Sequence, residues 1–291
     1  MKKNKVFASG LMLLATLFTV AGCSSGKQSF VKNTHPGYTI GRIIRNAKKS
    51  TNKNTNQNQN DATNNSSPVS NVSKDANYDS LANSNFVSGS NAVIKVNNDK
   101  STLNPSDWKT EKIVYGNLDN LNRTTTDIAY LSSKNLGKSQ GRDPQVWKPT
   151  GWNNQPKTVN GKRVFPQNRG HLLAYTLTFN FDQNGNYSQG HEGSLDNPKN
   201  LATQTAYSNQ KPMQFDSEDL VRNALEQGKK VIYKVTTVFR NDEKMPRGYW
   251  AQAISTDGTL NFNRYIYNVQ PGISFDYSTG KSSVDSNMIV K

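Results

Sequence analysis

The side chains best suited to chemistry lie in one short string and in two later residues. The string is Asn168-Arg169-Gly170-His171, and the later residues are Asn200 and Asn209. A neutral imidazole such as that of His171 can take a proton from water near neutral pH. The planar guanidinium of Arg169 is suited to a phosphate group. The side-chain oxygen of Asn209 is a hard, neutral ligand of the kind that Mg²⁺ accepts while keeping most of its waters.

Local signals predict a helix that carries both Asn residues. An Asn-Pro pair is typical of a helix start, so we expect a helix over residues 197–210, ended by Lys211-Pro212. On a period of 3.6 residues, Ala202, Ala206 and Asn209 would share one face. The small Ala side chains would let another element approach closely, with Asn209 at the end of that face.

A second helix is predicted to start at Asp216-Ser217, because acidic residues favour the first turn of a helix. In that position Glu218 is by default a first-turn residue that interacts with the helix dipole. Gly228 is expected to end the helix. An apolar stripe would face the core, formed by Leu220, Val221, Ala224 and Leu225.

Strand signals dominate the C-terminal part of the chain. β-Branched and aromatic residues predict strands over Val231–Phe239, Tyr249–Ile254 and Leu260–Val269, the last two joined by an Asp257-Gly258 turn. Shorter strands are predicted over residues 92–96 and 163–165. The second of these would precede His171, with Gly170 allowing a tight turn there. Residues 97–160 are rich in loop signals, and the order of elements favours an α+β fold with an antiparallel sheet.

Composition divides the chain into a polar segment and one folded domain. The 291 residues carry a net charge of +15, and only 33% are hydrophobic, against roughly 45–50% in globular chains. We expect one domain over residues 80–284 and a tail over 285–291. Residues 80–291 hold 25 basic and 18 acidic residues, which suggests a polyanionic partner such as nucleic acid or teichoic acid. The single cysteine excludes an intrachain disulfide and a metal cage built from cysteines.

The N-terminus has the order of an export signal. A basic start precedes the apolar run Val6–Val20, and Ala21-Gly22-Cys23 resembles the box of bacterial lipoproteins. We therefore expect a signal peptide over residues 1–22, lipidation of Cys23 and a location at the extracellular face of the cell membrane. An ordinary cleaved signal is the alternative. Residues 23–79 are rich in Asn, Gln, Ser and Thr, which predicts a disordered tether. No apolar run after residue 22 approaches the ~20 residues that span a bilayer, which excludes a channel or transporter.

The chemical strings, taken together, resemble a known family. Asn168–His171, Asn197–Asn200 and Gln204–Gln210 follow one another as in the DNA/RNA non-specific endonucleases, the ββα-metal nucleases. The likeness is strongest to the streptococcal type, which includes the membrane-bound DNA-entry nucleases and the secreted streptodornases. It spans about residues 80–280, including Lys148–Trp152 and Asn268–Gly272. It implies an α+β fold with a ββα-metal core and a central antiparallel sheet.

The resemblance also implies a role for each site residue. His171 matches the general base that activates water, and Asn209 matches the ligand of a single Mg²⁺, for which Mn²⁺ is a candidate substitute. Asn200 matches an Asn that orients water or phosphate near the metal. Glu218 matches an acidic residue that holds metal-bound water, and Arg169 matches an Arg with a phosphate-binding or structural role. The implied reaction is hydrolysis of DNA, with RNA as a second candidate substrate, to products with 5′-phosphates.

One residue departs from the family pattern, because Asn168 stands where an Asp is usual. An Asn cannot place a charge near the base, which leaves room for altered pH dependence or lower activity.

Two alternatives from other functional classes stay open: a non-catalytic DNA-binding surface lipoprotein, and a cell-wall or solute-binding lipoprotein. Taken singly, His171 could also be a turn residue, Asn209 a cap and Arg169 a solvated side chain. His191-Glu192, near two glycines, predicts an exposed loop. No obligate protein partner is implied.

Overall fold

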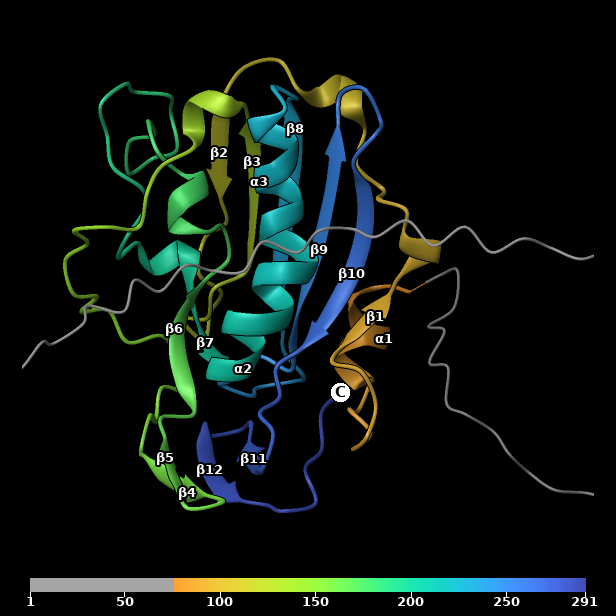
Figure 1. Cartoon of the computed structure of the whole chain (residues 1–291), viewed down its shortest axis with the longest axis vertical. Helices are drawn as coiled ribbons and strands as arrows, with labels where there is room; N and C mark the ends of the chain where they lie inside the picture. The colour runs from red at the N-terminus through yellow and green to blue at the C-terminus, as the bar shows by residue number, and fades with distance from the viewer. Residues whose placement is uncertain (1–75) are drawn as a thin grey trace, which may run out of the picture. The chain divides into compact units, whose positions relative to one another are not determined.

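A six-stranded antiparallel sheet forms the centre of the computed structural model, which describes residues 76–291 (Figure 1). The expected signal peptide, Cys23 and most of the expected tether lie outside these residues. The strand order is β1-β10-β9-β8-β3-β2. The strands are β1 (Val93–Lys95), β2 (Lys112–Tyr115), β3 (Thr126–Leu131), β8 (Val231–Val238), β9 (Gly248–Ser255) and β10 (Asn261–Tyr267). Within residues 76–291, no helix has the length and apolar character needed to cross a bilayer.

The strands predicted in the C-terminal part are confirmed, and so is the α+β class. β8, β9 and β10 pair as successive antiparallel neighbours, with Val231 opposite Ser255 and Asn261 opposite Ile254. The predicted hairpin turn is present, since Gly258 has a φ of 73° and its N–H donates to the Ser255 carbonyl at 2.9 Å. β2 and β3 fall inside residues 97–160, which are rich in loop signals and for which no element was predicted.

One long helix covers a face of the sheet (Figure 1). It consists of α2 (Ala206–Ser208), a π-helical segment (Asn209–Glu218) and α3 (Asp219–Glu226). Met213, Val221 and Leu225 are fully buried against sheet side chains. The apolar stripe predicted for the second helix is thus confirmed, and Gly228, with a φ of 78°, follows the helix end as expected. The short helix α1 (Tyr78–Asn83) belongs to a second apolar cluster that includes Val238, Tyr265 and Tyr267.

The helix predicted over residues 197–210 is wrong over residues 197–205, and the chain is helical only from Ala206 onward. Pro198–Asn200 forms a 3₁₀ turn, and Leu201–Thr205 is strand β7. All five residues of β7 are buried, so the alternation that marks a half-exposed strand is absent. Ala202 therefore does not share a helical face with Asn209. Pro212 does not end the helix either, because the wide turns of the π-helical segment accommodate a residue without an N–H.

Three two-stranded sheets lie beside the central one. β4 (Lys157–Val159) pairs with β5 (Lys162–Val164), and β11 (Ile273–Asp276) pairs with β12 (Lys281–Val284). The third sheet joins β6 (Gln167–His171) to β7. Residues 285–291, expected as a tail, bond back to the domain, as in the N–H of Lys291 to the Ser90 carbonyl at 3.0 Å.

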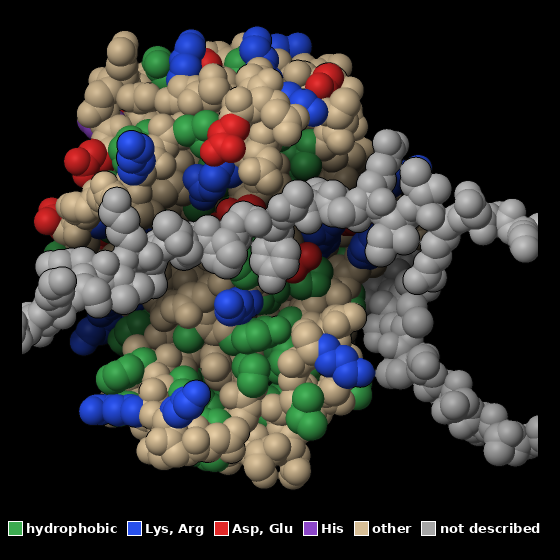
Figure 2. Space-filling view, viewed as in Figure 1, with side chains coloured by type: hydrophobic (Ala, Val, Ile, Leu, Met, Phe, Trp, Pro, Cys, Tyr) green, Lys and Arg blue, Asp and Glu red, His purple; other side chains and the backbone are tan. Residues whose placement is uncertain are grey.

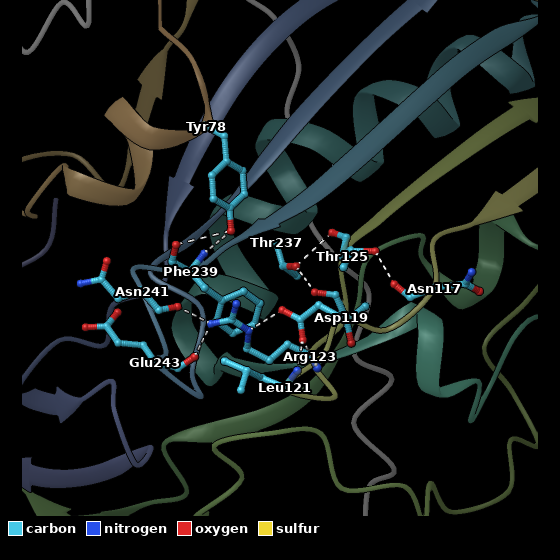
Figure 3. Close-up of polar contacts among 11 residues, drawn as sticks. Tyr78, Asn117, Asp119, Leu121, Arg123, Thr125, Thr237, Phe239, Asn241 and Glu243 are labelled. Atoms are coloured by element: carbon cyan, nitrogen blue, oxygen red, sulfur yellow. Dashed lines mark hydrogen bonds and ion pairs between the residues drawn. The ribbon is translucent and has the colours of Figure 1, made fainter.

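A partly buried arginine connects the loops at one end of the sheet (Figure 3). Arg123 lies between β2 and β3, and its Nε donates to Asp119 at 2.7 Å. Its Nη1 donates to the carbonyls of Asn241 at 2.6 Å and Glu243 at 2.9 Å, in the loop between β8 and β9. The guanidinium also stacks at 4.5 Å from the centre of the Phe239 ring.

Arg123→Ala is expected to lower the free energy of unfolding by about 2–4 kcal/mol, because two backbone carbonyls and one carboxylate lose a charged donor. Urea denaturation measures the change. Arg163→Ala is the matched control, since that side chain is exposed and stacks only on Phe165. Equal stability of the two variants would contradict the role given to Arg123.

Candidate active site

Two strands and a helix bring the predicted site residues into one supersecondary unit. β6 and β7 pair antiparallel, with Arg169 opposite Thr203 and His171 opposite Leu201. β7 leads directly into α2, and Asn209 is the first residue of the π-helical segment. In Figure 1 the helix rises beside this hairpin from the lower end of β7. The ββα order expected from the resemblance is therefore present in the chain.

Gly170 lies in a strand and not in the predicted turn. A Cβ at this position would lie 2.6 Å from the Cβ and 2.1 Å from the Oε1 of Gln204, which belongs to the neighbouring strand. The glycine is thus explained by a close approach of β6 and β7. Because side chains alternate along a strand, Arg169 and His171 point to one face of β6, and Asn168 points to the other.

His171 has a defined tautomer. Its Nε2 lies 2.9 Å from the Leu195 carbonyl oxygen. Since a carbonyl oxygen only accepts hydrogen bonds, Nε2 carries the proton and Nδ1 keeps its lone pair. Burial lowers the pKa of His171 to about 4, against the opposing effect of the Leu195 hydrogen bond, and the positive charge of Arg142 lowers it further. The ring is therefore neutral near pH 7, as a general base requires.

The Leu195 carbonyl is itself held by a distant loop. Gln145 Nε2 donates to the same oxygen at 3.2 Å. The neighbouring Asp196 accepts from the backbone N–H of Trp147 at 2.9 Å. The orientation of His171 thus depends on segments that lie before and after β6. A groove of ≈ 610 Å³ adjoins this region, and its lining includes Leu195, Asp196 and Lys199.

The lowered pKa of His171 predicts a loss of stability in acid. The unfolded chain takes up a proton at His171 below about pH 6.5, whereas the folded protein does so only near pH 4. The free energy of unfolding should therefore fall by about 2–3 kcal/mol between pH 7 and 4.5 through this residue alone. Urea denaturation of the wild type and of His171→Gln at both pH values isolates the effect. An identical pH dependence in the two proteins would disprove it.

Arg169 is partly buried and is held by an aromatic ring. Its guanidinium carbon lies 4.7 Å from the centre of the Trp152 ring. Its Nε is buried and has no hydrogen-bond partner within the described part of the chain. A buried donor without a partner calls for an explanation, and a phosphate group is a suitable acceptor for an arginine.

Asn200 is fully buried and bonds to the backbone next to the base. Its Oδ1 accepts from the N–H of Leu173 at 2.8 Å, and its Nδ2 donates to the carbonyl of Leu173 at 3.0 Å. The Asn200 carbonyl also accepts from the N–H of Leu172 at 3.0 Å. These bonds fix the segment that directly follows His171.

Asn209 and Glu218 lie at the two ends of the π-helical segment. Both are partly exposed, and none of the hydrogen bonds or ion pairs found among residues 76–291 uses either side chain. Burial raises the pKa of Glu218 to about 7, with Arg222 opposing and Asp219 adding to the shift. No group of three or more His, Cys, Asp or Glu side chains is placed to hold a metal in the described residues.

This donor set fits a Mg²⁺ ion that keeps most of its waters. A free amide oxygen at Asn209 is a suitable direct ligand, and the free carboxyl of Glu218 can accept from metal-bound water. A nearby cation would also favour the charged form of Glu218, which its surroundings otherwise disfavour.

Arg142 is a basic residue near His171 that the sequence analysis did not single out. Its guanidinium carbon lies 5.2 Å from the centre of the Tyr175 ring, and its charge acts on His171. Arg142 is exposed and lies within residues 97–160, for which no element was predicted. No local pattern therefore distinguished it from the other exposed basic residues. His191 and Glu192, in contrast, lie in an exposed loop as predicted.

Comparison with known proteins identifies the family of the chain and supports its fold. The family model for DNA/RNA non-specific endonucleases matches residues 100–256, more than half of the chain. The structure of NucA from Streptococcus agalactiae with bound magnesium is 32% identical, covers 66% of this chain and 87% of that one, and has a TM-score of 0.57. The same protein without metal gives a TM-score of 0.55. The structure of the Sda1 nuclease with bound zinc is 18% identical, with 67% and 97% covered and a TM-score of 0.51, and supports the fold.

Proposed function

Because this chain belongs to the DNA/RNA non-specific endonuclease family, and is a metal-dependent nuclease, we propose that it hydrolyses DNA with His171 as the general base. RNA is the second candidate substrate. The observation that carries the proposal is the hydrogen bond from His171 Nε2 to the Leu195 carbonyl, which leaves Nδ1 as a free acceptor.

The proton transfer follows from that tautomer. Nδ1 of His171 takes a proton from a water molecule as the water oxygen attacks the phosphorus of the scissile phosphodiester. The Leu195 carbonyl stabilises the imidazolium that forms, because Nε2–H keeps its acceptor throughout. The bond from phosphorus to the 3′ oxygen breaks, that oxygen takes a proton from solvent water, and the imidazolium returns its own proton to solvent. The products carry a 5′-phosphate and a 3′-hydroxyl.

Asn209 and Glu218 are the residues that we expect to hold Mg²⁺, with Asn209 as the direct ligand and Glu218 as the acceptor for a metal-bound water. When bound, the ion would supply positive charge at the scissile phosphate and the leaving oxygen. A magnesium ion is present in the related NucA structure, which supports this choice. Mn²⁺ is the candidate substitute.

The remaining polar residues would position the substrate and the base. The guanidinium of Arg169, whose Nε has no partner among the described residues, would bind a phosphate oxygen, and Arg142 adds a second positive charge near His171. Asn200 holds the Leu173 backbone, so we assign it a positioning role. Asn168 points to the other face of β6, which supports an active enzyme despite the departure from the family pattern.

Binding is expected to depend on the DNA backbone more than on base sequence. The net charge of residues 80–291 is +7, from 25 basic and 18 acidic residues. In Figure 2, Lys and Arg side chains are spread over the visible face and form no single patch. Contacts with phosphates alone carry little sequence information, and they weaken as salt is added.

The N-terminal pattern supports a place outside the cytoplasm. The basic start, the apolar run and Cys23 are the basis for proposing a lipid anchor at the extracellular face of the membrane. In that arrangement residues 23–79 would link the anchor to the nuclease domain.

End-group analysis tests the proposed chemistry. Fragments from a digest with Mg²⁺ should accept label from polynucleotide kinase only after phosphatase treatment, since the 5′ ends already carry phosphate. Equal labelling without phosphatase would show 5′-hydroxyl ends and overturn the mechanism. Binding of DNA without any fragments would favour the non-catalytic DNA-binding lipoprotein.

A further inference from the structure

The π-helical segment between Asn209 and Glu218 is unusual in its length. It spans ten residues, whereas π-helical turns normally occur singly within α-helices and often at functional sites. Its wide hydrogen-bonding pattern is visible at its end, where the N–H of Asp219 donates to the carbonyl of Gln214, five residues back. Pro212 lies inside the segment and has no N–H to donate.

This geometry decides which residues share a side of the helix. Asn209 and Glu218 are nine residues apart. With its bonds from i to i+5, a π-helix holds roughly 4.4 residues per turn, so nine residues make about two full turns. In an α-helix, with about 3.6 residues per turn, nine residues make about two and a half turns. The two side chains therefore lie on the same side of this helix, whereas an α-helix would place them on opposite sides.

An arginine from the sheet fixes the end of the wide segment. Arg264, on β10, donates from Nη1 to the backbone carbonyl of Asp216 at 2.8 Å, two residues before Glu218. Its Nε and Nη2 each bond to the carboxylate of Asp99 at 3.1 Å, which holds the guanidinium in place. The next residue, Ser217, bonds through its hydroxyl to Tyr233 on β8 at 2.7 Å.

We propose that Pro212 and Arg264 are positioning residues for the metal site. Pro212 prevents the helix from closing its ordinary i to i+4 bond at that position, and Arg264 holds the Asp216 carbonyl in the wide register. Together they keep Asn209 and Glu218 on the same side, so that both can serve one ion. The inference rests on the function proposed above for those two residues.

Pro212→Ala tests the first of these roles, because alanine supplies the N–H and favours the narrower helix. The Mg²⁺ concentration at half-maximal activity should rise about tenfold. The KM for DNA should not change, and the melting temperature should stay the same or increase. Mn²⁺ binding to the metal-free protein, followed by electron paramagnetic resonance, should weaken by the same factor. Lys211→Ala, at the exposed neighbouring position, is the control and should bind Mn²⁺ as the wild type does.

A double-mutant cycle shows whether Pro212 acts through Glu218. If it does, Pro212→Ala causes no further loss of Mn²⁺ affinity in a Glu218→Gln background. Arg264→Lys keeps the charge beside Asp99 but cannot make all three bonds, and it should give the same pattern. Full additivity, or wild-type Mn²⁺ affinity in both Pro212→Ala and Arg264→Lys, would overturn the inference. Wild-type affinity in Asn209→Ala and Glu218→Gln would instead refute the proposed metal site itself.

Discussion

Replacing His171 by alanine is expected to lower kcat for DNA cleavage by about 10³-fold, because the variant has no group to take the proton from the attacking water. The KM for DNA should change little, since the phosphate-binding groups are kept. The hydrogen bond to Leu195 is lost, but the loop retains the bonds of Gln145 and Asp196. Steady-state kinetics on a labelled duplex, with circular dichroism as the test of folding, measures both effects.

His191→Ala is the matched control for this variant. His191 is exposed and lies in the loop that precedes Leu195, so its loss should leave kcat unchanged. A His171→Ala protein that is folded and cuts DNA at the wild-type rate would remove His171 as the base. A similar loss of activity in both variants would place the base function elsewhere in the loop.

Asn209→Ala is the second change with a large expected effect. The variant loses the only direct protein ligand that we assign to the ion, so metal affinity should fall by about 100-fold or more. At low Mg²⁺ the activity should be nearly absent, and high Mg²⁺ should restore part of it. Calorimetric titration of the metal-free protein with Mg²⁺, beside activity measured over a range of Mg²⁺ concentrations, provides the test.

Gln210→Ala distinguishes a ligand effect from damage to the helix. Gln210 is the exposed neighbour of Asn209 at the start of the same segment. Its replacement should leave both metal affinity and activity intact. If Asn209→Ala showed the Mg²⁺ dependence of the wild type, Asn209 would have no role as a ligand.

The C-terminal strands could be predicted because their residue types strongly favour strands over helices. Val231–Val238 is β-branched and aromatic, and the Asp257-Gly258 turn fixes the hairpin that follows. The strand Thr126–Leu131 also alternates in burial, but its inward positions include Asp127, a carboxyl that is fully buried. Burial raises the pKa of Asp127 well above its ordinary value. Because Asp is normally a surface residue, its presence at a core position obscures the alternation of apolar and polar residues that would predict this strand.

The hairpin that carries the site could not be predicted for a related reason. Leu201–Thr205 is buried on both faces and holds Thr and Gln, so it shows neither alternation nor a continuous apolar run. From the sequence alone Gly170 suggests a turn. In the structure it lies in β6, where the side chain of Gln204 leaves no room for a Cβ. Pro212 predicts a helix end because sequence rules describe α-helices, and this helix widens at that point.

The residues of the proposed site were easier to single out than the contacts around them. His171 and Asn209 were proposed from residue type and from the resemblance of the strings around them. The Leu195 carbonyl that sets the tautomer of His171, and the charge of Arg142, come from loops on either side of β6. Such contacts depend on tertiary packing, which no local pattern in the sequence records.

Digestion of supercoiled plasmid by the wild type and by His171→Ala, each with Mg²⁺ and with EDTA, shows whether His171 and a metal ion are both needed for cleavage. Only the wild type with Mg²⁺ should convert the plasmid to fragments, while both proteins should bind it. Cleavage by His171→Ala, or cleavage by the wild type in EDTA, would contradict a metal-dependent endonuclease with His171 as its base.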